Sequence, residues 1–553
     1  MPTAVAHTAA VTDPAPDTCD VLVVGGGING AGIARDLAGR GWSVVLVERD
    51  DLASHTSSAS TKLIHGGLRY LEHGEFRLVR KALQEREVLL RSAPHLMRAQ
   101  RFVIPQDPAT GGRPAWLVRL GLFLYDHLAR RQVLPGSGAI DLRGHPAGQP
   151  LKPCFTRAFT YSDGWVDDAR LVVACAMDAR DRGATVLTRT ACTAARRHAD
   201  GWDVTLRPAE GPARTLRTRA LVNAAGPWAG AFLRDVARDD RGAAMGHARL
   251  RLVKGSHIVV PRRFAHDDAY LFQNADGRVL FALPYERDFT LIGTTDVELR
   301  DEPRAAPAID EAEVAYLCEQ ASRWFASPVS PAEVVWTYAG VRPLLEDAAG
   351  NPAAITRDYR LEAHGGPGSP AGAPLLTAWG GKITTFRRLA QEAADRVGEL
   401  LGETRKPWTA GAVLPGGDLS AWTKRPAMSA TPGDDFAEFR RALSTRWPWL
   451  PPTLRDRWAQ AYGARVALLL GGAQHAQDLG AEIAPGVFEV ELQYLRDREW
   501  AQTGEDVLWR RSKLGLHLGP AERARVADWM VRHHRAGAPD VALADRHAAS
   551  LPG

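Results

Sequence analysis

The sequence predicts an α/β protein with a parallel sheet, an antiparallel sheet and a helical C-terminal domain. Three observations support this prediction. A continuous apolar run at residues 21–24 leads into a glycine-rich turn and a helical pattern. Residues 184–221 alternate apolar and polar positions, as antiparallel strands do, and residues 269–296 contain three further strand-like runs. Beyond residue 433 the pattern is helical.

The first strand and the turn after it predict a dinucleotide site. Gly25, Gly27 and Gly30 follow the apolar run in G-x-G-x-x-G spacing. We expect Gly25 to allow the tight turn, Gly27 to admit a pyrophosphate, and Gly30 to let the helix pack close to the sheet. A second strand, 43–47, ends at Glu48, which lies near the roughly 20-residue spacing of a ribose-binding carboxylate. The motif alone does not distinguish FAD from NAD.

Later segments extend the pattern. Residues 76–90 intersperse apolar residues among charges and predict a solvent-facing amphipathic helix. In the segment that follows residue 163, Asp167 or Asp168 is the candidate helix N-cap. Arg342 stands just before Pro343, which should interrupt regular structure, so we expect this arginine in a loop, where binding residues concentrate.

Two turns beyond the first one also suit a ligand. Residues 221–228 read as a buried strand that ends in small residues, which allow close backbone approach. Residues 375–388 repeat the opening pattern of a strand, two glycines and a helix start. The unpaired N–H groups of that helix start would face a ligand.

Composition excludes several classes of protein. With 553 residues, 45% of them hydrophobic and 24% charged, the chain suggests a globular protein of two to four domains. The net charge of +5 fits an anionic substrate or a membrane surface only weakly. No basic stripe with interleaved aromatic residues is present, so we expect no nucleic-acid partner.

Cysteine and histidine usage predicts no metal site and no disulfides. The 5 cysteines are scattered without a C-x-x-C pair, which favours a reducing compartment. The histidines lack metal-ligand spacing. No stretch approaches the ~18 apolar residues of a membrane span. Residues 1–17 lack signal-peptide features and are expected to be a disordered tail.

A loop rich in hydroxyl groups follows the second strand. Thr56, Ser57, Ser58 and Ser60 could cap a helix and shape a turn, or could bind a phosphate or a flavin edge. Next, His65, Gly66 and Gly67 bring an imidazole beside backbone that can approach a flat ligand, and Arg69 and Tyr70 suit an anion.

This region, S-S-A-S-T-K-L-I-H-G-G-L-R-Y-L-E, resembles the FAD-dependent (aerobic, respiratory) glycerol-3-phosphate dehydrogenases. The resemblance extends over residues 18–520 in separate blocks, which include 113–128, 161–171, 221–228, 254–261, 292–298, 335–344 and 380–387. It implies a Rossmann-like FAD-binding domain interleaved with an antiparallel-sheet substrate domain, as in D-amino-acid-oxidase-like proteins, over residues 18–405. A C-terminal α-helical domain at 406–535 and a flexible tail at 536–553 would follow.

The resemblance also implies site residues. The cofactor-binding set is Gly25, Gly27, Gly30, Glu48, Ser57, Ser58, Ser60, Lys62, His65, Gly66, Gly67, Ala225, Gly226, Trp228, Gly381, Lys382 and Thr384. Arg69, Tyr70 and Arg342 would hold the substrate phosphate, because guanidinium forks match phosphate oxygens. His65 or His257 would accept the hydroxyl proton, a choice the sequence leaves open. Lys382 and the helix start beside it would stabilise the reduced flavin.

The implied activity is oxidation of sn-glycerol 3-phosphate to dihydroxyacetone phosphate by hydride transfer to FAD, with electrons passed to a quinone. The implied location is the cytoplasmic side, peripherally attached to the inner face of the plasma membrane. Residues 114–131 would form either a buried helix with basic ends or an interfacial segment on anionic lipid. The C-terminal domain would serve in packing, dimerisation or membrane docking. A homodimer is therefore one of the possible assemblies.

Three other functions remain in view. A glycerol-3-phosphate oxidase would pass electrons to O₂ and would form peroxide. A non-catalytic flavoprotein, acting as a redox sensor or scaffold, would show no reduction by substrate. An NAD-dependent dehydrogenase would be colourless when purified, whereas a flavoprotein would be yellow.

Overall fold

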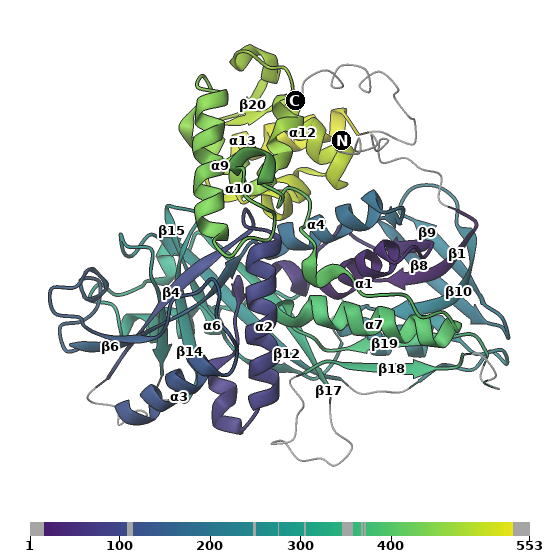
Figure 1. Cartoon of the computed structure of the whole chain (residues 1–553), viewed down its shortest axis with the longest axis horizontal. Coiled ribbons are helices and arrows are strands. Elements are labelled where there is room, and N and C mark those ends of the chain that lie inside the picture. Colours follow the sequence, from purple (N-terminus) through teal and green to yellow (C-terminus); the bar gives the residue numbers. More distant parts are fainter. Residues whose placement is uncertain are drawn as a thin grey trace.

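The computed structural model describes residues 16–107, 114–246, 250–274, 276–302, 306–345, 358–366, 369 and 372–534. Two large sheets form the body of the molecule, and helices from the C-terminal part of the chain gather on one side of it (Figure 1). The predicted tails at 1–17 and 536–553 lie almost entirely outside the described residues.

The first sheet contains the predicted parallel strands. β1 (Thr18–Val24) runs parallel to β2 (Val44–Val47) and to β10 (Arg214–Asn223), and β10 runs parallel to β19 (Leu375–Trp379). The carboxyl ends of these strands therefore meet at one edge, where ligands bind in open α/β sheets. The remaining strands of this sheet are β7 (Thr185–Leu187), β8 (Thr190–Arg197), β9 (Trp202–Pro208), β11 (Ala237–Arg238) and β18 (Arg360–His364).

Three helices cover this sheet with one apolar core. They are α1 (Ile28–Gly39), α4 (Asp168–Asp181) and α7 (Phe386–Leu401), and α1 packs against both of the others. Val21 and Val23 of β1 are fully buried beneath them, as expected for a central parallel strand. Asp167 is the N-cap of α4, since its Oδ1 accepts a hydrogen bond from the Arg170 N–H at 3.2 Å.

The second sheet is mostly antiparallel. Its long strand β12 (Leu250–Pro261) pairs with β15 (Phe289–Gly293) and with β17 (Trp336–Leu345), which places His257 opposite Tyr338. The other strands are β3 (Leu63–Ile64), β4 (Met97–Pro105), β5 (Gly138–Asp141), β6 (Arg157–Val166), β13 (Ala269–Gln273), β14 (Val279–Tyr285) and β16 (Val297–Leu299).

The prediction that Arg342 lies in a loop is wrong. Arg342 lies within β17, opposite Val253 of β12, and the strand continues through Pro343. Among the described strands β17 pairs with β12 alone, so it is an edge strand of the sheet. An edge strand tolerates a proline because the missing N–H is lost on the side that has no neighbour.

The expected solvent-facing helix is only partly exposed. It is α2 (Phe76–Ser92), and charged residues in its second half are buried. Arg86 donates to Asp163 at 2.6 Å, and Arg387 of α7 donates to both oxygens of Glu85 at 2.6 Å. These charges join the two sheets and their helices, and therefore do not form a solvated face.

The C-terminal helices have a hydrophobic core of their own, built from residues between Leu419 and Met530. The elements are α8 (Ser420–Thr423), α9 (Pro432–Arg446), α10 (Pro452–Tyr462), α11 (Val466–Leu470), the hairpin β20 (Glu482–Ala484) and β21 (Val487–Phe488), α12 (Glu489–Glu499), the π-helix η12 (Asp506–Arg511) and α13 (Pro520–Arg532). Within the described chain, every helix is too short or too polar to cross a bilayer.

The first glycine turn can form only because Gly30, in α1, has no side chain. A Cβ at Gly30 would lie 1.8 Å from the Gly25 carbonyl oxygen, so no other residue fits without moving the turn.

We predict that Gly30→Ala lowers the free energy of unfolding by about 1–3 kcal/mol, through overpacking. The matched control is Gly121→Ala in α3 (Ala115–His127), where nothing lies within 4 Å of the added Cβ. That substitution should raise stability by about 0.5–1 kcal/mol, because alanine loses less backbone entropy than glycine. Urea unfolding of both variants is the measurement, and equal effects of the same sign would contradict the packing argument.

Candidate active site

A long cavity opens where the parallel strands end. Residues that follow β1, β2, β10 and β19 line it together. Of the residues predicted to bind the cofactor, the structure brings eight into this lining: Gly25, Gly27, Glu48, Ser57, Ala225, Gly226, Trp228 and Gly381. Segments more than 300 residues apart in sequence thus form one surface.

The β1–α1 turn is built for close approach. Gly25 has φ +113°, and a Cβ there would lie 2.5 Å from the Ala224 carbonyl oxygen. The Ile28 N–H at the start of α1 donates to Ser57 Oγ at 2.9 Å. A helix N-terminus with a hydroxyl oxygen already against its N–H group is a site that also suits a phosphate oxygen.

At the other end of the turn, Glu48 holds the loop after β2. Its two carboxylate oxygens accept hydrogen bonds from the Gly26 N–H at 2.6 Å and from the Asp50 N–H at 2.8 Å. Burial raises the pKa of Glu48, although these two N–H groups act in the opposite direction. The predicted ribose-binding carboxylate therefore lines the cavity and also fixes its wall.

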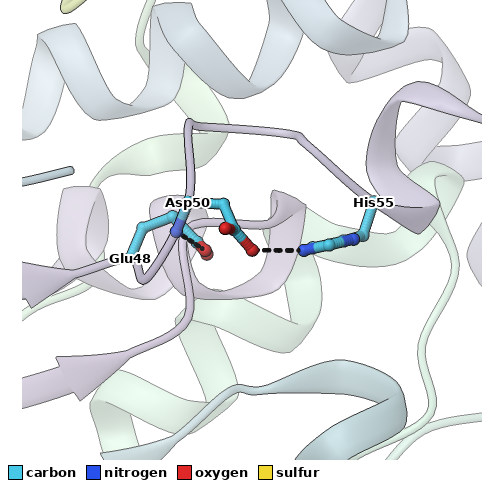
Figure 2. Close-up of side chains that lie close together, drawn as sticks. All are labelled: Glu48, Asp50 and His55. Atoms are coloured by element: carbon cyan, nitrogen blue, oxygen red, sulfur yellow. Dashed lines mark hydrogen bonds and ion pairs between the residues drawn. The ribbon is translucent and has the colours of Figure 1, made fainter. Parts of the chain in front are cut away.

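Figure 2 shows that Glu48, Asp50 and His55 gather closely, with potential ligand atoms within 4.8 Å of one another. The sequence predicts no metal site. In the structure, hydrogen bonds hold these three side chains in place. His55 Nε2 bonds Asp50 Oδ2 at 2.8 Å, and both Glu48 oxygens accept backbone N–H groups. The His55 ring also packs edge-on against Trp228, and the Arg49 guanidinium lies over the same indole at 4.2 Å.

The second glycine turn, after β19, closes against the first. Asn29 Nδ2 donates to the Gly380 carbonyl oxygen at 3.0 Å, and a Cβ at Gly381 would lie 2.9 Å from the Asn29 side chain. Asn29 Oδ1 and His55 Nδ1 are buried side-chain atoms of the cavity lining that have no hydrogen-bond partner among the described residues. A long polar ligand with donors and acceptors would satisfy both atoms, so the lining fits a dinucleotide.

Other predicted cofactor residues have structural partners. Lys62 is 1% exposed and donates to Asp168 at 2.8 Å, and Ser60 donates to the same carboxylate at 2.7 Å. Burial lowers the pKa of Lys62, against the opposing effect of Asp168. The Ser58 carbonyl also accepts a hydrogen bond from Lys62 Nζ, at 2.5 Å. This ion pair fixes the hydroxyl-rich loop to the start of α4.

His65, Gly66 and Gly67 lie beside the second glycine turn. The His65 N–H donates to Thr384 Oγ1 at 3.1 Å, and the Gly66 N–H donates to Tyr125 at 2.7 Å. Gly67 has φ +76°, and the Tyr70 ring occupies the position where a Cβ would point. The Tyr70 ring in turn lies under Lys382 Nζ at 3.9 Å.

Arg342 lies close enough to act electrostatically on both predicted histidines, and Lys382 on His65. Pro343 and Gly381 line the cavity, and their chain neighbours are Arg342 and Lys382. Arg342 is paired with Asp296 and donates to Thr294 Oγ1 at 3.3 Å. Arg69 is exposed and has no hydrogen bond or ion pair within the described residues.

Burial and nearby cations keep both imidazoles neutral. Burial lowers the pKa of His65; Asp163 opposes this, and Lys382, Arg86 and Arg342 add to it. Burial, Lys62 and Arg342 place the pKa of His257 well below its ordinary value. His257 is enclosed: it is 1% exposed, stacks on Tyr338 at 4.7 Å, and Nε2 bonds Thr61 Oγ1 at 2.9 Å.

Sequence reasoning missed Asn29, Arg49 and His55. Asn29 lies within the glycine motif, where an amide beside the turn was a usable signal. Arg49 and His55 follow Glu48 closely, but their contact with Trp228 depends on a strand nearly 180 residues further along the chain.

Comparison with known proteins agrees with this geometry. The family model described as FAD dependent oxidoreductase matches residues 20–387. The solved structure of the glycerol-3-phosphate dehydrogenase from Bacillus halodurans, complexed with FAD, is similar at a TM-score of 0.71 and 26% identity, and the match covers 93% of this chain and 90% of that one. The L-alpha-glycerophosphate oxidase from Mycoplasma pneumoniae shares the fold, at a TM-score of 0.54 and 17% identity over 72% of this chain and 98% of that one.

Two curated relatives match nearly the whole chain. D-erythritol 1-phosphate dehydrogenase from Brucella abortus is 48% identical over 93% of this chain and 98% of its own length. Aerobic glycerol-3-phosphate dehydrogenase from Escherichia coli is 46% identical over 94% and 98%. The predicted fold is confirmed, and the family decides between the two cofactors that the glycine motif leaves open. The chain belongs to the FAD dependent oxidoreductase family.

Proposed function

We propose that this protein oxidises the secondary hydroxyl of a small phosphorylated polyol, with sn-glycerol 3-phosphate converted to dihydroxyacetone phosphate as the first candidate reaction. The observation that carries the proposal is that Arg342 and Lys382, the chain neighbours of the cavity residues Pro343 and Gly381, both lie close enough to His65 to lower its pKa, in addition to burial. The names of the Escherichia coli and Bacillus halodurans relatives support the substrate.

Arg342 is suited to hold the phosphate. Its side chain is 41% exposed, and its described partners are the half-exposed Asp296 carboxylate and the Thr294 hydroxyl. A phosphate dianion offers more negative charge and more acceptor oxygens than one carboxylate, so it can replace Asp296 on the guanidinium. Arg69, exposed beside Tyr70, can supply a second fork to the same phosphate.

His65 is the better placed proton acceptor. Its ring nitrogens have no hydrogen-bond partner within the described residues and it is only partly buried. A lowered pKa keeps the imidazole unprotonated near neutral pH, as a base must be. His257 is enclosed by Tyr338 and Thr61, so its role would be to shape the wall.

FAD, when bound, supplies the two-electron acceptor for the oxidation. The residues that would hold it are the glycines of both turns, Glu48, Ser57 and Asn29. Lys382 and the N–H groups that open the helix after it place positive charge beside this part of the cavity. The chain therefore binds the phosphate, removes the hydroxyl proton and provides an electropositive wall.

A second substrate has specific support. The relative from Brucella abortus is named for D-erythritol 1-phosphate. It is 48% identical to this chain, whereas the glycerol-3-phosphate dehydrogenases of Pseudomonas aeruginosa and Escherichia coli are 47% and 46% identical. Both compounds place a secondary hydroxyl next to a phosphate-bearing carbon, so the same guanidinium groups and base would serve either.

We predict that the flavin absorbance near 450 nm falls within seconds when sn-glycerol 3-phosphate is added without oxygen. D-erythritol 1-phosphate, supplied in parallel, should bleach the flavin at least ~10-fold more slowly if glycerol 3-phosphate is the better substrate. A later addition of a quinone, and then of O₂, distinguishes a dehydrogenase from an oxidase by which one restores the colour. No bleaching by either compound would overturn the proposed activity.

The identity of the base can be tested through its neighbours. Lys382 lowers the pKa of His65 but is not among the groups that act on His257. We predict that Lys382→Met moves the acid limb of kcat/KM to higher pH, because removing a nearby positive charge favours the protonated imidazole. Lys382→Arg, which retains the charge, is the control and should leave the limb in place. An acid limb that does not move in Lys382→Met would exclude His65 as the base.

The electron acceptor and location are a separate part of the proposal: electrons pass to a quinone at a membrane surface. The support is an apolar face on α3 and the start of α2, here called the α3 face. Its exposed residues are Phe76, Trp116, Leu117, Leu120 and Phe123. Arg77, Arg80 and Arg119 are exposed nearby. Val118, Leu122 and Tyr125 of α3 are buried, so this helix is half-buried. Figure 1 shows α3 on the side of the molecule away from the C-terminal helices.

The occupant that fits the α3 face is an anionic bilayer. Aromatic and aliphatic side chains enter the headgroup region while arginines contact lipid phosphates. Arg113, the predicted basic residue before α3, lies outside the described residues.

We predict that the double variant Trp116→Glu, Phe123→Glu binds vesicles containing phosphatidylglycerol at least about tenfold less tightly. The reason is that two apolar side chains that would enter the bilayer are lost. Val531→Glu is the matched control, since Val531 is 74% exposed on α13 of the C-terminal region. Vesicle co-sedimentation is the measurement. Equal loss in the control, or none in the double variant, would contradict the assignment.

A further inference from the structure

The C-terminal helical domain touches the cofactor cavity from outside. The contact is made by the loop after β2, residues 48–57, here called the cofactor loop. Seven residues of the cofactor loop line the cavity: Glu48, Arg49, Ala53, Ser54, His55, Thr56 and Ser57. Asp51 and Leu52 face away from it and are buried, at 1% and 0% exposure.

Asp51 is held by two arginines of the π-helix η12. Arg511 is 0% exposed and donates to both Asp51 oxygens, from Nη1 at 2.6 Å and from Nη2 at 2.7 Å. Arg510 Nε donates to Asp51 Oδ2 at 2.7 Å. Arg511 is itself fixed, because Nε and Nη2 donate to the Glu499 carbonyl oxygen at the end of α12. A planar guanidinium bonded on both edges sets the position of the carboxylate it holds.

Asp51 transmits this position to the cavity. Its carbonyl oxygen accepts hydrogen bonds from the N–H and the hydroxyl of Ser54, at 3.2 and 2.5 Å. Ala53, which directly precedes Ser54, donates its N–H to the Gly26 carbonyl oxygen in the glycine motif, at 3.2 Å. Ala53 has φ +61°, a conformation rare for residues with a side chain, so the loop needs external contacts to stay in this form.

A second contact of the same kind holds the segment next to the cofactor loop. Asp506, at the start of η12, accepts from Arg189 Nη2 at 2.6 Å, and Arg189 has φ +49°. Arg189 directly precedes Thr190, Ala191 and Cys192 of the cavity lining. The N–H groups of Arg189 and Thr190 donate to the carbonyl oxygens of Asp50 and Glu48 in the cofactor loop, at 2.8 and 2.7 Å, so the two segments adjoin. Burial opposes ionisation of Asp506, yet Arg511, Arg510 and Arg189 hold its pKa at about 2, so the carboxylate is charged at neutral pH.

We propose that η12 of the C-terminal domain is part of the cofactor site, with Arg511 as the positioning residue that holds the cofactor loop and Asp506 as its counterpart for the adjoining residues 189–192. The consequence is that the FAD affinity of the chain depends on a domain that contributes no described residue to the cavity lining. The proposal rests on membership of the FAD dependent oxidoreductase family and is independent of which polyol phosphate is the substrate.

The test compares two interdomain ion pairs. Arg511→Gln removes the bidentate contact to the cofactor loop. Arg465→Gln, just before α11, breaks a pair with Asp181 of α4 and a hydrogen bond to Tyr494 of α12, and none of these three residues lines the cavity. Release of FAD is followed by the recovery of flavin fluorescence on dilution, and thermal unfolding of each apoprotein reports the fold.

We expect Arg511→Gln to release FAD about tenfold faster or more, because a smaller fraction of molecules holds the loop in its binding form. With excess FAD its kcat should return to the unaltered value, since the loop acts on affinity alone. Arg465→Gln should lower the unfolding temperature without faster FAD release.

Arg189→Gln, at a more exposed position, should release FAD several-fold faster and keeps the proposal testable if Arg511→Gln does not fold. Unchanged FAD release from both Arg511→Gln and Arg189→Gln, or equally fast release from Arg465→Gln, would overturn the proposal.

Discussion

The side chain of Asn29 holds the two glycine turns of this protein against each other. Its amide donates to the Gly380 carbonyl oxygen, a hydrogen bond between residues 351 positions apart. The turns leave β1 and β19, which lie on either side of β10 and both pair with its last three residues, 221–223. Their closure makes one cavity from two loops, and it sets where Lys382 and Arg342 stand relative to the start of α1. Positive charge therefore gathers at the place where the helix dipole also points.

Local signals were enough to predict the elements that begin this arrangement. The apolar run, the spacing of Gly25, Gly27 and Gly30 and the N-cap at Asp167 each depend on neighbours within a few residues, and the structure has them as expected. Prediction from the sequence failed where residues far along the chain determine the conformation or the partner of a side chain. Arg342 lies in a strand because β12 pairs with it, and Lys62 is held by Asp168, which is 106 residues away. A hydroxyl-rich loop looks the same in sequence whether its partner is a ligand or a buried carboxylate.

Charge is used in two ways around the cavity. Next to the cavity residues Pro343 and Gly381, Arg342 and Lys382 add to the effect of burial and lower the pKa of His65, so the imidazole stays neutral. Outside, Arg510, Arg511 and Arg189 are paired with Asp51 and Asp506 and hold the walls. The sequence of the C-terminal domain contains no catalytic pattern, and ion pairs that only hold the loop in position do not require one. Its contribution is visible only when segments more than 450 residues apart are seen together.

The central claim is that the joined glycine turns form the FAD site, and calorimetric titration of the apoprotein with FAD tests it most directly. The account predicts one FAD bound per chain, and an affinity at least about tenfold weaker in Asn29→Val, where the amide that joins the turns is lost and a buried carbonyl is left unpaired. An apoprotein that takes up no FAD, or an Asn29→Val variant that binds it as tightly as the unaltered chain, would contradict the claim.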